Sequence, residues 1–202
     1  MAYRHLWTPL QLGPVETRNR IVFSAHLTNY ARDGRPTDQH AAYYAARAAG
    51  GSGLIITEEH STHPTDWPYE KLIHGFHRDV IPGYRRITEA VHRHRVPIFA
   101  QINHNGGQAS SMYSRLPVWA PSAVADPLFR EVPKAVSLAE IDEIVVLVVA
   151  LGSGRRVVGS RPAGARWLRR IGVVGACHLS VPRRRRRPRR SRLRPPRRRS
   201  AA

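Results

Sequence analysis

Hydrophobic and polar positions along the first 150 residues predict strands that alternate with helices. Short apolar runs rich in β-branched residues occupy residues 20–26, 53–59 and 96–103. Runs of this kind are typical of strands buried on both faces of a parallel sheet. Residues 10–18, which precede the first run, are predicted to form a short β-hairpin.

Apolar side chains at helical spacing follow each of these runs. Residues 36–51 form an alanine-rich segment with a helix start signal at Thr37. Residues 80–95 repeat the helical spacing, and Ser137 with Glu140 forms a capping box ahead of a third helix. The order βαβαβα predicts a parallel sheet with right-handed crossovers.

Polar residues follow the third strand where it is expected to emerge from the sheet. Gln101, Asn103, His104 and Asn105 end the apolar run, and two glycines come directly after them. In parallel α/β folds the carboxyl ends of the strands and the loops behind them form the ligand site. These side chains are therefore candidates for contact with a polar ligand, and the glycines allow a sharp turn or a close approach of the backbone.

Charge divides the chain into two unequal parts. Up to Ala150 there are 15 Lys and Arg against 14 Asp and Glu, whereas from Leu151 onward there are 18 Arg and no acidic residue. We therefore predict that residues 147–202 form a disordered Arg/Pro-rich tail, because like charges repel and prolines break helices. Two interpretations of this tail stay open. It binds nucleic acid non-specifically through phosphates, or it is an out-of-frame translation of GC-rich codons.

Three features bear on the compartment of the protein. Cys177 is the only cysteine, so no internal disulfide can form. The N-terminus lacks the basic start and the apolar core of about 7 to 15 residues that mark a signal peptide. The longest apolar run, which begins at Ile144, is far shorter than the roughly 20 residues of a membrane-spanning helix. We expect a cytoplasmic protein that does not contact a membrane.

Three separate blocks of sequence resemble the opening third of the old yellow enzyme family. These blocks, "LWTPLQLGPVETRNRIVFSAHLTNY", "GGSGLIITEE" and "AQINHNGGQAS" with "WAPSAV", occur in the order and at the spacing of the family. The resemblance covers about residues 5 to 146 and is greatest to the branch of 2,4-dienoyl-CoA reductase and trimethylamine dehydrogenase.

The resemblance implies a partial (β/α)8 TIM barrel, of which residues 1–146 supply the first three βα units. It also implies an FMN-binding oxidoreductase that transfers hydride from NADH or NADPH through the flavin to an enone or enoyl-type acceptor. The family's later motifs, including its active-site histidine motif and phosphate-binding loops, are not found in the sequence. We therefore expect a truncated and inactive form, and we assign no catalytic residue.

The resemblance places the flavin against the ends of the first three strands. The cofactor-binding residues that it implies are Ser24, Ala25, His26, Leu27, Glu59 and Gln101, with His104 in the substrate-side loop. Gln101 is expected to bond the pyrimidine edge of the flavin, because a carboxamide offers both a donor and an acceptor. Glu59 departs from the family, which has a small residue there. For His26, contact with the flavin ring and support of a tight loop stay open as alternatives.

The other histidines do not predict a metal site. His60 with His63, and His74 with His77, have the spacing of metal ligands, but zinc sites usually need cysteine or carboxylate partners in a recognisable frame. We interpret them as surface or loop residues. The expected partner is a small-molecule substrate.

Overall fold

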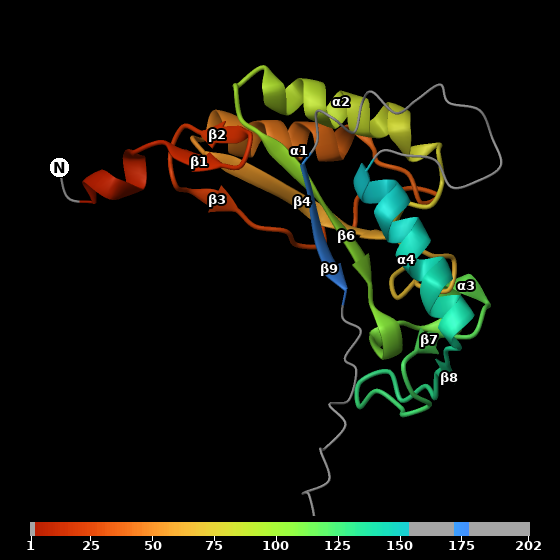
Figure 1. The fold of residues 1–202 in the computed structure, drawn as a ribbon. Coiled ribbons are helices and arrows are strands. Elements are labelled where there is room, and N and C mark those ends of the chain that lie inside the picture. The colour runs from red at the N-terminus through yellow and green to blue at the C-terminus, as the bar shows by residue number, and fades with distance from the viewer. Residues whose placement is uncertain (1–2, 154–171, 178–202) are drawn as a thin grey trace, which may run out of the picture.

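The computed structural model describes residues 3–153 and 172–177. Its centre is a parallel sheet with the strand order β3-β4-β6-β9. These strands are β3 (Val22–Phe23), β4 (Leu54–Ser61), β6 (Ile98–His104) and β9 (Gly172–Cys177). Figure 1 shows that two helices, α1 (Asp38–Ala49) and α2 (Val80–His92), lie together over one face of this sheet. The predicted alternation of strand and helix is confirmed.

The N-terminal segment forms a hairpin ahead of the sheet. A 3₁₀ helix, η1 (Arg4–Trp7), leads into the antiparallel strands β1 (Leu10–Leu12) and β2 (Val15–Thr17). Gly13 in the turn has a φ of 56°, a left-handed conformation that glycine adopts without strain. The hairpin predicted at residues 10–18 is thus confirmed.

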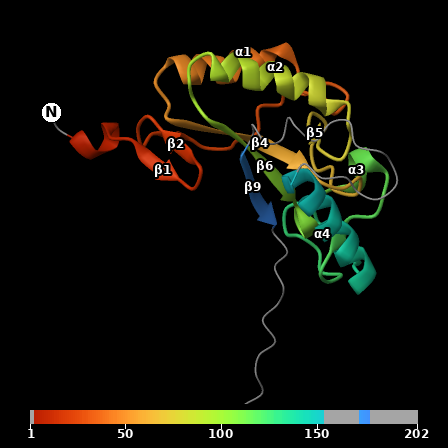
Figure 2. The same ribbon diagram turned by 45° about the horizontal axis from the view of Figure 1, so that its top comes forward.

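The hydrophobic core lies between the sheet and the two helices. Figure 2, turned by 45°, also shows α1 and α2 side by side over the strands. Fully buried side chains from the three layers meet there, including Tyr44 of α1, Ile87 of α2 and Ile55 of β4. Complete burial of such a side chain stabilises the fold by roughly 1.5–3 kcal/mol. The core fixes the strand ends relative to each other.

The segment after β6 forms short elements followed by one long helix. The short elements are η2 (Gly106–Gln108), α3 (Ser111–Ser114), β7 (Trp119–Ala120) and β8 (Lys134–Ala135), and β5 (Ile73–His74) adds to the far end of β4. The helix α4 (Leu138–Ser153) contacts β6 and β9. Its predicted capping box is present, because the backbone N–H of Ser137 donates to Oε2 of Glu140 at 2.9 Å and the N–H of Glu140 donates to Oγ of Ser137 at 3.3 Å.

Two described elements fall within the region from residue 147 that was predicted to be a disordered tail. The helix α4 continues to Ser153, and β9 pairs in parallel with β6 from Phe99↔Gly172 to His104↔Cys177. Residues 171–182 contain no arginine, so the repulsion expected from the average composition does not act within this run. The other tail residues, 154–171 and 178–202, lie outside the described residues, and nucleic-acid binding by the tail stays a prediction.

Candidate functional site

A bulge in β4 decides which of two adjacent glutamates faces each side of the sheet. Between the paired positions Ile56 and Glu59, two residues, Thr57 and Glu58, lie opposite a single residue of β6. Regular alternation would place Ile56 and Glu58 on the same face. Instead, Glu58 is fully buried against α1, whereas Ile56 and Glu59 are half-buried on the other face. The bulge therefore turns Glu59 toward the face away from the helices.

The side chains of β6 continue this second face toward the strand end. Asn103 donates from Nδ2 to Oε2 of Glu59 and, at 3.0 Å, to Oδ1 of Asn105. Gln101, two residues before Asn103, lies on the same face and is half-buried. Within the described part of the chain, no hydrogen bond engages the Gln101 carboxamide. The backbone carbonyl of Gln101 accepts from Nδ1 of His60 at 2.6 Å. A carboxamide with this freedom can bond a ligand through both its oxygen and its nitrogen.

The turn predicted to line the cofactor follows β3 at the same end of the sheet. Ala25 and Leu27 are partly buried, and Ser24 and His26 are exposed. His26 packs edge-on against Phe23 at 5.2 Å, and its Nε2 lies 2.6 Å from the hydroxyl of Tyr43 in α1. These contacts tie His26 to α1 and support its interpretation as a residue that shapes the turn.

A buried polar network behind this turn was missed by the sequence analysis. The Glu58 carboxylate accepts from the backbone N–H of Thr28 at 2.9 Å and from its hydroxyl at 2.7 Å, and it lies 2.6 Å from Nε2 of His40. Burial tends to raise the pKa of Glu58, but the hydrogen bonds from His40 and Thr28 outweigh it and lower this pKa. A glutamate within a buried apolar run indicates that a hydrogen-bonding partner lies nearby, because an unpaired buried charge destabilises the fold.

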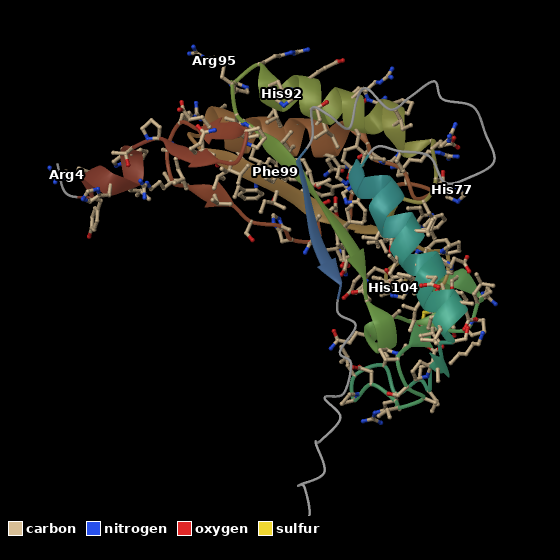
Figure 3. All side chains as sticks on the ribbon, viewed as in Figure 1. Arg4, His77, His92, Arg95, Phe99 and His104 are labelled. Carbon is tan, nitrogen blue, oxygen red and sulfur yellow. The ribbon has the colours of Figure 1, made fainter. Side chains whose placement is uncertain are left out.

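His104 lies inside the protein at the end of β6. Figure 3 labels Phe99 and His104 near the two ends of this strand. His104 is fully buried, and its Nδ1 accepts from the N–H of Gly106 at 3.1 Å. Burial lowers its pKa to about 4, so the ring is neutral near pH 7. This placement supports a role in shaping the loop, and the structure gives no support to contact with a substrate.

A buried carboxylate holds the next part of the loop. Oδ1 of Asp66 accepts from the backbone N–H of Asn105 at 2.9 Å, and the Asp66 side chain has no exposed surface. Burial raises the pKa of Asp66 to about 7. Beyond it, a cavity of about 450 Å³ is lined by loop residues that include Asn105, Gly107, Ser122 and Asp126. This cavity extends the site beyond the end of β6.

The interpretation of the paired histidines as surface residues is wrong for His60, His63 and His74, which are buried against aromatic rings. His60 packs on Tyr84 of α2 with ring centroids 4.8 Å apart, and His63 stacks on Trp119 at 4.4 Å. His74 stacks on Phe76 at 5.2 Å. Across residues 3–153 and 172–177, no three His, Cys, Asp or Glu side chains are grouped as metal ligands. The same residues include no helix long and apolar enough to cross a membrane.

Comparison with known proteins identifies relatives for the same part of the chain. Residues 5–147 match the sequence model of the NADH:flavin oxidoreductase / NADH oxidase family. The chain is 32% identical over 143 residues to the probable N-methylproline demethylase of Rhizobium meliloti (strain 1021), an overlap of 69% of this chain and 21% of the relative. It is 34% identical over 149 residues to the NADH oxidase of Thermoanaerobacter brockii, an overlap of 71% of this chain and 22% of the relative.

A solved structure shows the same arrangement of strands and helices. The old yellow enzyme homologue from Zymomonas mobilis matches with a TM-score of 0.67 at 28% identity, over 73% of this chain and 44% of that chain. The chain thus spans about a fifth of the length of the two curated relatives and less than half of the solved protein.

Proposed function

The chain belongs to the NADH:flavin oxidoreductase / NADH oxidase family, and from this premise we propose that it forms part of the FMN site of an NAD(P)H-dependent oxidoreductase. Its sheet is the corresponding part of an old yellow enzyme TIM barrel. The family binds FMN and uses NADH or NADPH. When bound, FMN supplies a ring that accepts and donates hydride, and the protein supplies binding and orientation.

The residues at the strand ends fit the ring side of FMN. The observation that carries the proposal is the Gln101 carboxamide, which lies half-buried on the face away from the helices without a hydrogen-bond partner among the described side chains. A flavin pyrimidine edge presents both donors and acceptors, and a carboxamide matches both. The turn formed by residues 24–27 lies at the same end of the sheet, because β3 and β4 pair in parallel. We assign FMN contact to Gln101 and to this turn.

Each residue of the site has a distinct task in this proposal. Gln101 binds the polar edge of the ring and fixes its orientation in the plane. Ala25 and Leu27 give the ring an apolar neighbour that excludes water. Asn103 holds the Glu59 carboxylate by a hydrogen bond, so that its negative charge has a fixed position beside the ring site.

The compound that accepts hydride from the flavin is inferred from the family resemblance, which indicates an enone or enoyl-type substrate. One observation favours a second class. The carboxylate of Glu59 lies on the face proposed to hold the ring, and a fixed negative charge attracts a cation. The similar protein from Rhizobium meliloti is named as a demethylase of N-methylproline, whose amine carries a positive charge at neutral pH. A cationic N-methyl amine is therefore the second candidate substrate.

Titration of the full chain with FMN tests the proposal. We expect the fluorescence of FMN to be quenched on binding, and Gln101→Leu to weaken binding about tenfold, since roughly one hydrogen bond of 1–2 kcal/mol is lost. Gln39→Leu, at an exposed position of α1, is the matched control. Equal affinity of the two variants would contradict the assignment of Gln101. Oxidation of NADH or NADPH in the same samples tests the predicted inactivity.

A further inference from the structure

The Glu58 carboxylate joins three parts of the fold at one buried point. Its Oε2 atom accepts from the N–H of Thr28 at 2.9 Å, and its Oε1 atom accepts from the Thr28 hydroxyl at 2.7 Å. Oε1 also lies 2.6 Å from Nε2 of His40 in the first turn of α1. Thr28 directly follows the turn of residues 24–27, so the carboxylate connects this turn to β4 and to α1.

The hydrogen bonds of His40 fix which ring nitrogen carries the proton. The backbone N–H of Thr37 donates to Nδ1 of His40 at 2.9 Å, so Nδ1 acts as an acceptor. The ring proton therefore resides on Nε2, the nitrogen that lies 2.6 Å from Oε1 of Glu58. The side chains of both His40 and Glu58 have no exposed surface. Capping of α1 and orientation of Glu58 thus depend on the same imidazole ring.

This arrangement meets the demands of a buried carboxylate. A buried charge without hydrogen bonds is strongly destabilising, and here three donors surround the two oxygens. Two of these donors belong to Thr28, which is only half-buried. The hydroxyl of Thr28 also accepts from the N–H of Tyr30 at 3.3 Å. The position of Thr28, and with it the end of the turn, is therefore set by Glu58.

We propose that Glu58, oriented by His40, is a positioning residue that holds the turn of residues 24–27 in the geometry required for flavin contact. This inference rests on the proposed function. Glu58 does not touch the cofactor, because it faces α1 on the opposite side of the strand from Glu59. The β4 bulge therefore gives the two glutamates separate tasks. Glu58 supports the site from the face that packs against α1, and Glu59 lines the site on the opposite face.

Substitution of Thr28 tests the link without disturbing the core. Glu58→Gln would place an amide N–H against a buried donor and would destabilise the fold. Thr28→Val removes only the hydroxyl that donates to Glu58, at a half-buried position. Thr28→Ser restores the hydroxyl. Thr17→Val is the matched control, because it makes the same chemical change in the hairpin, where the hydroxyl donates to the Leu10 carbonyl at 3.2 Å.

Two measurements on the full chain separate positioning from general stability. We expect Thr28→Val to weaken FMN binding about tenfold, the change that corresponds to one charge-assisted hydrogen bond, and to speed amide hydrogen exchange in residues 24–30. Thr28→Ser should restore both values to within about threefold of the parent chain. Thr17→Val should leave both values unchanged while lowering the midpoint of urea unfolding.

The outcomes distinguish the inference from the proposed function. Equal loss of FMN affinity in Thr28→Val and Thr17→Val, or failure of Thr28→Ser to restore it, overturns the positioning role of Glu58. Absence of FMN binding by the parent chain overturns the proposed function instead. In that case the exchange measurement still decides whether Glu58 holds the turn, because unchanged exchange in Thr28→Val contradicts the link itself.

Discussion

Gly34 and His74 approach each other so closely that a Cβ atom at position 34 would lie 2.3 Å from Nδ1 of His74. The two residues are also joined by a backbone hydrogen bond of 2.9 Å from the His74 N–H to the Gly34 carbonyl. Gly34 has a φ of 69°, which other residues adopt only with strain. Glycine is therefore required here both by the backbone conformation and by the space that remains.

Replacement of this glycine should destabilise the fold. We expect Gly34→Ala to lower the free energy of unfolding by about 2 to 4 kcal/mol, from left-handed strain and steric overlap together. Gly13→Ala is the control, because Gly13 also has a positive φ but no atom within 4 Å of a new Cβ. Urea unfolding should show a loss of only about 1 kcal/mol for the control. Similar losses of unfolding free energy in both variants would show that the His74 ring moves aside at little cost.

The buried carboxyl group of Asp66 predicts a fall in stability as the pH rises from about 3.8 to about 7. Burial raises its pKa from 3.8 to about 7, so the folded chain keeps a proton that the unfolded chain has lost. The resulting stabilisation is full below about pH 3.8 and is lost as the pH rises to 7. Asp66→Asn should remove this slope and unfold at higher urea than the parent chain at pH 8. Asp38→Asn, at an exposed position, is the control. A parallel pH dependence in Asp66→Asn and the parent would refute the assignment.

Buried histidines predict a second loss of stability in acid. Burial lowers the pKa of His60 and of His104 from 6.5 to about 4, so the unfolded chain binds protons first. Their stabilisation is present above about pH 6.5 and is lost as the pH falls to 4. His104→Asn retains an acceptor for the N–H of Gly106 and cannot be charged. Thermal unfolding between pH 4 and 7 should therefore show a shallower acid slope in this variant, and an unchanged slope would argue against the buried neutral ring.

The charge of Glu59 should decide between the two candidate substrates. Glu59→Gln keeps an oxygen for the Asn103 amide but removes the negative charge. We expect the dissociation constant of a cationic N-methyl amine to rise about tenfold, as the loss of one close charge pair implies, while that of a neutral enone stays the same. Equilibrium titration of FMN-loaded chain with each compound measures this difference. An equal effect on both compounds would remove the argument for an amine substrate.

The sequence predicts the order of elements better than it predicts the contacts at the site. Apolar periodicity located β4, β6 and both core helices, because each of these patterns is local. The bulge in β4 breaks the regular alternation of strand residues, and this break separates Glu58 from Glu59. The link from Glu58 to Thr28 spans 30 residues, so no local pattern contains it. Strand β9 was missed because the composition of the whole tail concealed a short uncharged run.

The spatial order β3-β4-β6-β9 is also the order in which the strands leave the ribosome. Along this order each new strand is added to the outer edge of the sheet that is already present, and none of these four described strands has to be inserted between two others. The two-residue strand β5 pairs with β4 outside this order. At a synthesis rate of about 5–20 residues per second, the helix that follows each strand can cover the sheet before the next strand arrives. The topology therefore lets the sheet assemble vectorially during translation, with the turn after β3 made first and its anchor, Glu58, added with the next strand.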